Sequence, residues 1–418
     1  MQLTPRTSRL FAPLVAAALC AALGLAAVEQ AQASDGIASA VEAPTIKLSV
    51  AARCGLQAKR ATSGRNASTR AAARKLRRVR RARSTVQRRC TKRLNRAGAK
   101  RQGTPQATQS FSAPVIGPLV MGIDGGYGGW SESELEERAA LGAAVTRHEW
   151  DPGEPVNAQD SLVYEAAAKV HTRIHALLGA NELGDAAHYR EWVVAFIRRY
   201  GIGGSFWREN PELDAAHYAI TTFELGNEPY FGGMTASEYA STVTPTLEEV
   251  QRLGLPVKII LPSRVYGNDT SWMDTLYKVI PNLNTLFYGF ADHPYWYGHD
   301  PAEVSAAGPL GRITTLRNRM NALGASSKPI FLSEYGESTA NCGSECVDEA
   351  TQAQHLAEMV EAVTSHTEWG VEMLSVFQLV DRGTDSSDRE LEFGLLRQNG
   401  TPKPSYSIVH EAMQEHRG

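Results

Sequence analysis

The sequence predicts an α/β protein of the (β/α)8 barrel class (a TIM barrel), preceded by a basic, partly helical N-terminal segment. Eight short apolar runs follow residue 116, and amphipathic, helix-like stretches separate them. The eight repeats occupy about 300 residues, and such barrels take about 200 to more than 400. A doubly wound sheet would also alternate, but no glycine-rich phosphate loop follows an early run, so a nucleotide-binding fold gains no support.

Each apolar run is predicted to be one barrel strand. In chain order the runs are Pro118–Ile123, Ala143–Thr146, Val170–Leu177, Ala219–Leu225, Val257–Leu261, Leu286–Ala291, Pro329–Leu332 and Glu372–Phe377. Two of the intervening helices have clear signals. Thr235 and Glu238 form a capping-box pattern before apolar residues at helical spacing. Apolar residues from Ala350 to Val363 repeat with the same spacing.

Residues 1–33 have the pattern of an export signal. Arg6 and Arg9 form a positive start, residues 10–28 are apolar, and Ala31-Gln32-Ala33 fits the small-x-small cleavage pattern. No later run of apolar residues is long enough to span a bilayer. We therefore expect a secreted or cell-wall-associated protein with no transmembrane segment after signal removal.

Residues 34–112 form an Arg- and Ala-rich segment with linkers. Twenty Lys or Arg and no Asp or Glu lie between Lys47 and Arg101, whereas residues 102–418 hold 21 basic and 42 acidic residues. Two interpretations stay open: a solvated stalk, and a polycation, residues 47–101, that binds an anionic cell-wall polymer. No nucleic acid is expected, because no aromatic residues interleave with the arginines for base stacking.

Four cysteines follow the signal segment. An even number in an exported chain indicates two disulfides, and the clustering favours Cys54–Cys90 and Cys342–Cys346. A zinc site is the weaker alternative, because "CGSEC" has no accompanying Cys or His pair at metal-finger spacing.

Polar and aromatic residues follow most of the predicted strands. In a (β/α)8 barrel such residues converge on the C-terminal face, where active sites lie. Clusters of charged and aromatic side chains are of the kind that a carbohydrate site uses. The residues concerned are Asp124, Arg147 to Trp150, Arg173, His175, Asn227, Glu228, Asp292 to Trp296, Ser333 to Tyr335, Gln378 and Asp381.

Glu228 and Glu334 are the candidate catalytic residues. Both follow apolar runs at matched places, after the fourth and the seventh strand. Cleavage of a glycosidic bond needs two carboxyl groups, one to protonate the leaving oxygen and one to stabilise or attack the oxocarbenium-like centre. Strands four and seven lie nearly opposite each other, so the two side chains can meet over the barrel mouth.

At these residues the sequence resembles a known group of enzymes. "FELGNEPY" and "IFLSEYGES" resemble the strand-four and strand-seven signatures of the retaining (β/α)8 glycoside hydrolases of clan A. "RYGIGGSFWRENPEL", "ADHPYWYG" and "FGLLRQNGTPKPSYSIVHEAM" resemble members related to families 5 and 39. The resemblance covers residues 113–418, which we expect to form the catalytic domain.

The resemblance implies a retaining β-glycosidase that hydrolyses a polysaccharide or oligosaccharide by double displacement. Glu228 would be the general acid/base, with its pKa raised by the charge on Glu334, the nucleophile. Asn227 would bind the sugar 2-hydroxyl. The side chains of Arg147 and Tyr295 would hold the nucleophile ionised.

The same resemblance implies that His293 binds sugar or a catalytic carboxylate. Three further residues are candidates from their positions after the predicted strands. Trp150, Trp296 and Asp124 are substrate-contact candidates; packing at the barrel rim or in the core is the alternative for the tryptophans. Phe377 stands where many clan members have a tryptophan sugar platform.

No metal or organic cofactor is expected, and we expect a monomer. Two alternatives stay open: a non-catalytic or wall-anchored carbohydrate-binding barrel, and a transglycosylase that uses the same pair of glutamates.

Overall fold

The computed structural model describes residues 117–180, 183–303, 305–384 and 387–417. The predicted signal segment, the basic segment 34–112 and the predicted Cys54–Cys90 disulfide lie outside the described residues. Those three expectations remain predictions.

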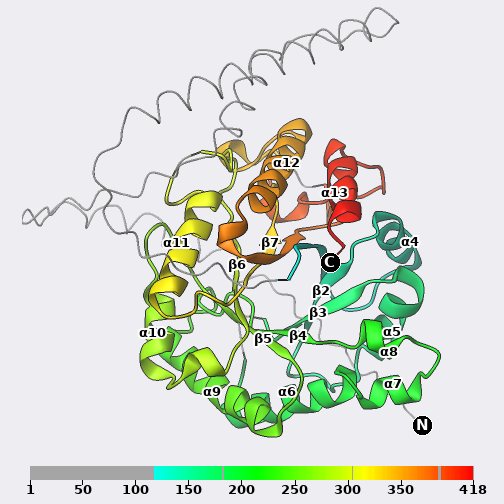
Figure 1. The fold of residues 1–418 in the computed structure, drawn as a ribbon. Helices are drawn as coiled ribbons and strands as arrows, with labels where there is room; N and C mark the ends of the chain where they lie inside the picture. Colours follow the sequence, from blue (N-terminus) through cyan, green and yellow to red (C-terminus); the bar gives the residue numbers. More distant parts are fainter. Residues whose placement is uncertain (1–116, 181–182, 304, 385–386, 418) are drawn as a thin grey trace, which may run out of the picture. The chain divides into compact units, whose positions relative to one another are not determined.

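Eight parallel strands close into a barrel in simple chain order, β1 to β8 (Figure 1). This confirms the predicted (β/α)8 fold. The strands are β1 (Val120–Tyr127), β2 (Val145–Trp150), β3 (Arg173–Leu178), β4 (Thr222–Leu225), β5 (Lys258–Pro262), β6 (Gly289–Asp292), β7 (Ile330–Tyr335) and β8 (Val371–Val376).

Helices surround the strands on the outside of the barrel (Figure 1). The α-helices are α4 (Glu132–Leu141), α5 (Asp160–Glu165), α6 (Ala186–Tyr200), α7 (Ser205–Glu209), α8 (Ala215–Tyr218), α9 (Ala236–Leu253), α10 (Ser271–Val279), α11 (Pro309–Ala322), α12 (Glu349–Ser365) and α13 (Pro404–Glu415). A π-helical turn, Ala166–Val170, follows α5, and short 3₁₀ turns cover Leu283–Thr285, Gly343–Glu345, Thr367–Trp369 and Arg389–Leu391.

All eight predicted strands are present, with shifted ends. The third strand, which was expected to begin at Val170, begins three residues later. The π-helical turn occupies that position, and His171 ends it in the left-handed region with φ 58°, so β3 begins only at Arg173. The strands β1 and β7 run further than predicted, to Tyr127 and Tyr335, and both carry a register shift near their ends.

The barrel interior changes character along its axis. A small apolar cluster inside the barrel consists of Ile260, Ala291, Phe331 and Met373. Toward the C-terminal strand ends the interior is polar and includes the buried side chains of Arg147, Glu224 and Ser333. The main hydrophobic core lies instead between the strands and the helices. A polar layer above an apolar floor is therefore available for chemistry at the mouth.

Two local predictions are confirmed. Helix α9 begins with a complete capping box, in which the Thr235 hydroxyl accepts from the Glu238 N–H and the Glu238 carboxylate accepts from the Thr235 N–H. Cys342 and Cys346 form a disulfide in the segment that follows β7. No helix in the described part of the chain is both long and apolar enough to cross a bilayer.

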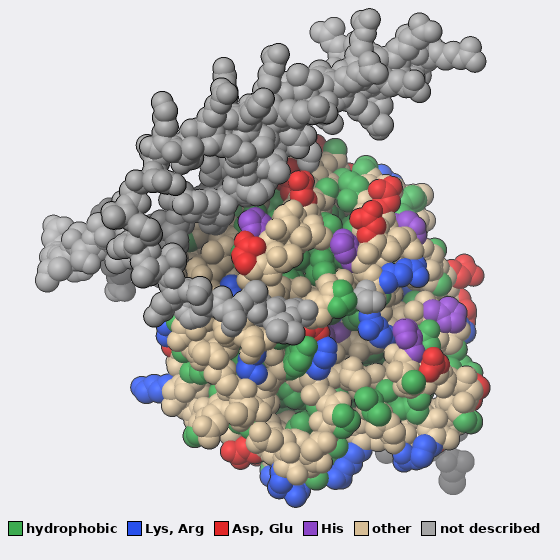
Figure 2. Space-filling model, in the orientation of Figure 1, with side chains coloured by type: hydrophobic (Ala, Val, Ile, Leu, Met, Phe, Trp, Pro, Cys, Tyr) green, Lys and Arg blue, Asp and Glu red, His purple; other side chains and the backbone are tan. Residues whose placement is uncertain are grey.

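Charged side chains of both signs are interspersed on the face drawn in Figure 2. No broad area of a single sign is visible among the described residues of that face.

Replacing Thr235 by Ala should lower the free energy of unfolding by about 1 kcal/mol, because one N-cap hydrogen bond of α9 is lost. Urea unfolding followed by circular dichroism would measure it. Ser237→Ala is the matched control, since Ser237 is an exposed residue of the same first turn. Equal stability of the two variants would contradict a stabilising role for the cap.

Candidate active site

A bulge near the end of β7 aims two adjacent side chains into the barrel. Between Leu332 and Tyr335 the strand advances three residues while its partner β8 advances two. Ser333 and Glu334 therefore both reach the interior: the Ser333 hydroxyl donates to Glu224, and the Glu334 carboxylate accepts from Arg147. In a regular strand, successive side chains would point to opposite faces, and a bulge is a known means of re-aiming one.

The backbone after β4 turns sharply at the other candidate carboxylate. Gly226 has φ 87° and Glu228 has φ 42°, in the left-handed region. The Asn227 N–H donates to the carbonyls of Gly179 and Ala180, which fixes this turn against the end of β3. A non-glycine residue in this region costs about 1–3 kcal/mol and is often found at functional sites.

Arg147 is the centre of the polar layer and is only 2% exposed. Its Nη1 donates to Glu334 at 2.7 Å and to Asp124 at 3.0 Å. Its Nε and Nη2 donate to the two oxygens of Glu224 at 3.0 and 3.2 Å, and Nη2 also donates to Asn227 Oδ1 at 2.8 Å. Burial lowers the pKa of Arg147, but the charges of Glu224, Glu334 and Asp124 outweigh burial and raise it well above its ordinary value.

His293 lies between the two candidate catalytic carboxylates. Its Nδ1 is 2.9 Å from Glu228 Oε1 and 3.6 Å from Glu334 Oε2, so these two oxygens are at most about 6.5 Å apart. Its Nε2 is 2.9 Å from the Ser333 hydroxyl. Burial lowers the pKa of His293, but the charges on Glu334 and Glu228 outweigh it and raise the pKa to about 10.

The pKa values of the two glutamates differ from the expectation. Burial raises the pKa of Glu228, but the charge and hydrogen bond of His293 outweigh burial and lower it. Burial raises the pKa of Glu334. The charges of His293 and Arg147 act to lower it, but burial outweighs them, so the pKa stays above its ordinary value. The expectation that the pKa of Glu228 is raised is therefore wrong for this arrangement, because the charge and the hydrogen bond of the neighbouring His293 lower it.

Tyr295 completes the contacts of Glu334. Its hydroxyl donates to Glu334 Oε2 at 3.1 Å, while Arg147 holds Oε1. The Tyr295 ring stacks on Tyr297 with centroids 5.2 Å apart, and the Tyr297 ring lies under the Arg389 guanidinium at 3.7 Å. Both oxygens of Glu334 thus accept hydrogen bonds, one from Arg147 and one from Tyr295.

Glu224 is a member of the site that the sequence-based prediction missed. It is 1% exposed and accepts from Arg147, from the Ser333 hydroxyl at 3.2 Å and from His175 Nε2 at 2.9 Å. Burial raises the pKa of Glu224, but Arg147 and His175 outweigh it and hold the pKa well below its ordinary value. The available signal was a charged residue inside the apolar run of "TFELGNE".

Trp150 does not belong to the site. It is 1% exposed, and its ring packs edge-on against Phe196 with centroids 5.1 Å apart, in the core outside the barrel. Side chains alternate along a strand, so Trp150, three residues after the inward-facing Arg147, faces the helices. Its prediction as a substrate contact is therefore withdrawn.

The other predicted substrate contacts differ in position. The Asp124 carboxylate pairs with Arg147 and also accepts from the Gly126 N–H at 2.9 Å. Trp296 is half-buried and stacks on His299 at 4.2 Å in the segment after β6. Asn227 and His293 contact Arg147 and Glu228, as described above. Among the described residues, no group of three or more His, Cys, Asp or Glu side chains is arranged to hold a metal ion.

Replacing Glu224 by Ala should lower the free energy of unfolding by about 3–5 kcal/mol, because it leaves Arg147 buried without its bidentate partner. Since the pKa of Glu224 is lowered by folding, its contribution is present above its unfolded-state pKa and is lost as the pH falls through the folded-state value. Urea unfolding at several pH values measures both effects.

Glu249→Ala is the control for this prediction, since Glu249 makes an exposed ion pair with Arg252, and such pairs contribute little. A Glu224→Ala variant as stable as this control would contradict the structural role given to Glu224.

No protein-family model matches the sequence, and no curated protein sequence matches it. Several solved structures share its fold. They include a family 39 glycoside hydrolase from Bacteroides cellulosilyticus WH2 (13% identity, 71% of this chain and 63% of that chain, TM-score 0.54). A further example is a glucosidase from Croceicoccus marinus (14% identity, 72% of this chain and 69% of that chain, TM-score 0.55). Another is a GH39 β-xylosidase from Caulobacter crescentus (14% identity, 72% of this chain and 72% of that chain, TM-score 0.51). This chain therefore spans less than two thirds of the first of these proteins, and it has the (β/α)8 fold that these glycoside hydrolases have.

Proposed function

We propose that residues 113–418 form a retaining glycosidase that hydrolyses O-glycosidic bonds of an oligosaccharide or polysaccharide. The observation that carries the proposal is the placement of Glu228 and Glu334 on either side of one histidine, His293, whose Nδ1 lies 2.9 and 3.6 Å from their oxygens. Similarity of fold to known glycoside hydrolases supports the reaction class. The substrate is expected to be a carbohydrate.

The spacing of the two carboxylates favours retention of configuration. Retaining enzymes hold their carboxyl groups about 5–5.5 Å apart, and inverting enzymes hold them about 6.5–9.5 Å apart to make room for a water. The oxygens of Glu228 and Glu334 that face His293 are at most about 6.5 Å apart, from their distances of 2.9 and 3.6 Å to one nitrogen. The second carboxylate is therefore close enough to act as a nucleophile.

Glu334 is assigned as the nucleophile. Its carboxylate attacks the anomeric carbon, the bond to the leaving oxygen breaks, and a glycosyl ester forms. Donation by Arg147 to one oxygen and by Tyr295 to the other orients the carboxylate and favours its ionised form against burial.

Glu228 is assigned as the acid and base, with His293 as the holder of its proton. The charge on Glu334 is one of the causes of the raised pKa of His293. When Glu334 forms the ester it loses that charge, so His293 releases its proton more readily. In the same step, while the bond to the leaving oxygen breaks, the proton moves along the 2.9 Å hydrogen bond to Glu228 and on to that oxygen.

The second step reverses these transfers. Water attacks the anomeric carbon, gives a proton to Glu228 and releases the Glu334 carboxylate, and the proton returns to His293. Asn227 accepts from Arg147 through its amide oxygen. Its amide NH₂ is therefore assigned to the sugar 2-hydroxyl, where hydrogen bonds strengthen in the transition state. Trp296 is retained as a candidate sugar contact.

The two rivals make different predictions from the same residues. A non-catalytic carbohydrate-binding barrel would have no need of a buried histidine between two carboxylates, so this arrangement favours an enzyme. A transglycosylase would differ only in the acceptor that resolves the ester. Secretion and binding of an anionic wall polymer through residues 47–101 are further proposals that rest on the sequence alone.

Glu334→Ala should lose turnover on aryl β-glycosides by at least about a thousandfold, because no covalent intermediate can form. Azide should restore part of the activity and yield an α-glycosyl azide, identified by NMR.

Glu228→Ala should lower turnover by about 10²–10⁴-fold, because the leaving oxygen then receives no proton from the acid. The loss should be smallest for substrates whose leaving group needs no protonation. The control is Glu212→Ala, which removes an exposed glutamate. Full activity of both catalytic variants on every cleaved glycoside would sink the assignment.

His293→Ala should move the acidic limb of the kcat/KM profile to higher pH. The charge of His293 lowers the pKa of Glu334, so its removal raises that pKa, and the nucleophile becomes ionised only at higher pH. The profile should be measured on one aryl glycoside beside His217→Ala, which removes an exposed histidine of α8. An acidic limb that stays in place in His293→Ala would argue against a charged His293.

A further inference from the structure

A stack of three side chains stands beside the proposed nucleophile, and we call it the Arg–Tyr–Tyr stack. The guanidinium carbon of Arg389 lies 3.7 Å from the centroid of the Tyr297 ring. The Tyr297 ring stacks on the Tyr295 ring, with centroids 5.2 Å apart and an angle of 24° between the planes. The Tyr295 hydroxyl donates to Glu334 at 3.1 Å. Successive contacts therefore connect an arginine in the segment after β8 to the carboxylate on β7.

The two tyrosine rings have an apolar neighbour on one side and a cation on another. Phe393 is buried and lies edge-on to both rings, with its centroid 6.0 Å from that of Tyr295 and 6.2 Å from that of Tyr297. Tyr297 is only half-buried. The face of an aromatic ring is negative, so a cation within about 6 Å of the centroid is attracted to it. Arg389 therefore covers a ring that the core alone leaves partly open.

Three polar contacts fix the position of Arg389. Its backbone carbonyl accepts from the hydroxyl of Ser338, a buried residue, at 2.7 Å. Its Nη1 donates to Glu345 at 2.8 Å, and its Nη2 donates to Glu390 at 3.0 Å. Ordering a long arginine side chain costs conformational entropy, and the two ion pairs together with the ring contact offset that cost. The guanidinium is thus held over the ring by its own partners.

The disulfide Cys342–Cys346 closes the short segment that carries Glu345. The backbone of the same segment packs against the residue that follows Tyr297. A Cβ on Gly298 would overlap the carbonyl oxygen of Ser344, and Gly298 has φ 72°, so both the space and the backbone conformation require glycine there. The disulfide-closed segment therefore contacts the surroundings of the stack twice, through the Glu345 carboxylate and through the Ser344 backbone.

The hydrogen bond that the stack supports affects the ionisation of the nucleophile. Glu334 is buried, and burial raises its pKa. Donation by the Tyr295 hydroxyl favours the ionised form and so acts against burial. If Tyr297 lost its cover, the Tyr295 ring could move, and its hydroxyl would donate to Glu334 for a smaller part of the time. The carboxylate would then ionise only at higher pH and would be less well oriented for attack.

We propose that Arg389 is a positioning residue for the nucleophile: it holds the Tyr297 ring in place, and through that ring it keeps the Tyr295 hydroxyl on Glu334. This inference rests on the proposed function and adds to it a residue that lies outside the network around Arg147. Arg389 acts through two intervening side chains, so its effect should depend on the Tyr295 hydroxyl.

Arg389→Met should lower kcat/KM by about three- to tenfold on an aryl β-glycoside that the wild-type protein cleaves, the effect of one lost contact between a cation and a ring. The acidic limb of the kcat/KM profile should move to higher pH, because Glu334 loses part of its hydrogen bond. Arg389→Lys should lose less than Arg389→Met, since it keeps a cation near the Tyr297 ring.

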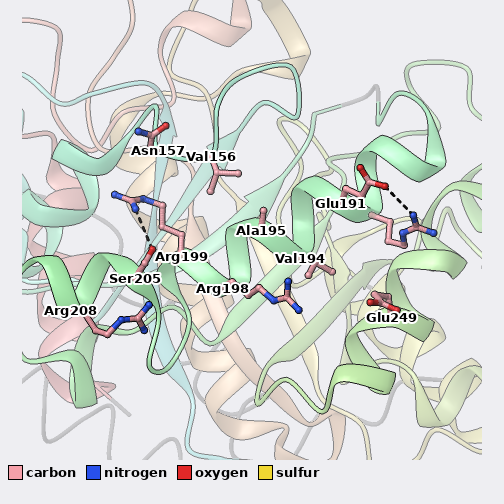
Figure 3. A pocket seen from close by; sticks show the side chains of 11 residues that line it. Val156, Asn157, Glu191, Val194, Ala195, Arg198, Arg199, Ser205, Arg208 and Glu249 are labelled. Atoms are coloured by element: carbon pink, nitrogen blue, oxygen red, sulfur yellow. Dashed lines mark hydrogen bonds and ion pairs between the residues drawn. The ribbon is translucent and has the colours of Figure 1, made fainter.

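The matched control is Arg198→Met. Arg198 is exposed and lines a separate cavity of about 860 Å³ on the outer face of α6 and α7 (Figure 3). The same substitution there removes an arginine that is not part of the Arg–Tyr–Tyr stack. Both kcat/KM and the acidic limb should stay as in the wild type.

A double-mutant cycle distinguishes action through Tyr295 from a direct effect of the lost charge. Tyr295→Phe alone should lower kcat/KM by about 10–100-fold, because it removes a hydrogen bond to a charged group. Arg389→Met added to Tyr295→Phe should lower kcat/KM by less than about a further twofold, because the hydroxyl that Arg389 positions is already absent. A direct effect of the Arg389 charge on Glu334, or a general loss of folded protein, would persist in the Tyr295→Phe background.

A second variant guards against misfolding of Arg389→Met. Glu345 is exposed, so Glu345→Gln needs no repacking. It should lower kcat/KM by about twofold, the effect of one exposed ion pair, and should have no effect in the Arg389→Met background.

Separate outcomes bear on the inference and on the proposed function. Wild-type kcat/KM in Arg389→Met, or losses that multiply when Arg389→Met and Tyr295→Phe are combined, would overturn the inference and leave the proposed function intact. If no glycoside were cleaved by the wild-type protein, the proposed function itself would fail, and this inference with it.

Discussion

The burial of one positive charge, that of Arg147, organises the mouth of this barrel. A guanidinium that is 2% exposed must be surrounded by acceptors, and here Asp124, Glu224 and Glu334 supply them from three different strands. Removing charges from water costs several kcal/mol per ion, so such a cluster is stable only when its hydrogen bonds are nearly complete. The geometry of Glu334 is therefore set by a requirement of folding as well as by chemistry.

A second cation, His293, links this cluster to Glu228. The charges of the two glutamates on either side raise the pKa of the histidine. The histidine in turn acts to lower the pKa of each glutamate. Loss of charge at one glutamate therefore changes the proton affinity of the other groups. This mutual dependence gives the proposed reaction its order: the formation of the ester itself releases the proton that the leaving group needs.

The sequence predicted those features that depend on local pattern. The eight strands, the capping box at Thr235 and the Cys342–Cys346 disulfide all follow from short stretches, and all are present. Glu224 was missed because its importance comes from Arg147, 77 positions earlier in the chain. The predicted direction of the pKa shift of Glu228 was wrong. The shift depends on the distance to His293, which the spacing of residues along the sequence does not give. Trp150 could have been excluded, since strand alternation places it opposite to Arg147.

The bulge in β7 has a consequence for how such a site could be transferred to another barrel. Glu334 reaches the interior beside Ser333 because β7 has one residue more than β8 in the paired stretch that ends at Tyr335. A point substitution that places a glutamate on a regular strand would either displace the inward-facing residue or leave the carboxylate among the helices. Transfer of this site to another barrel by design therefore requires insertion of one extra residue that forms a bulge. The extra residue in the strand matters more than the identity of any one side chain.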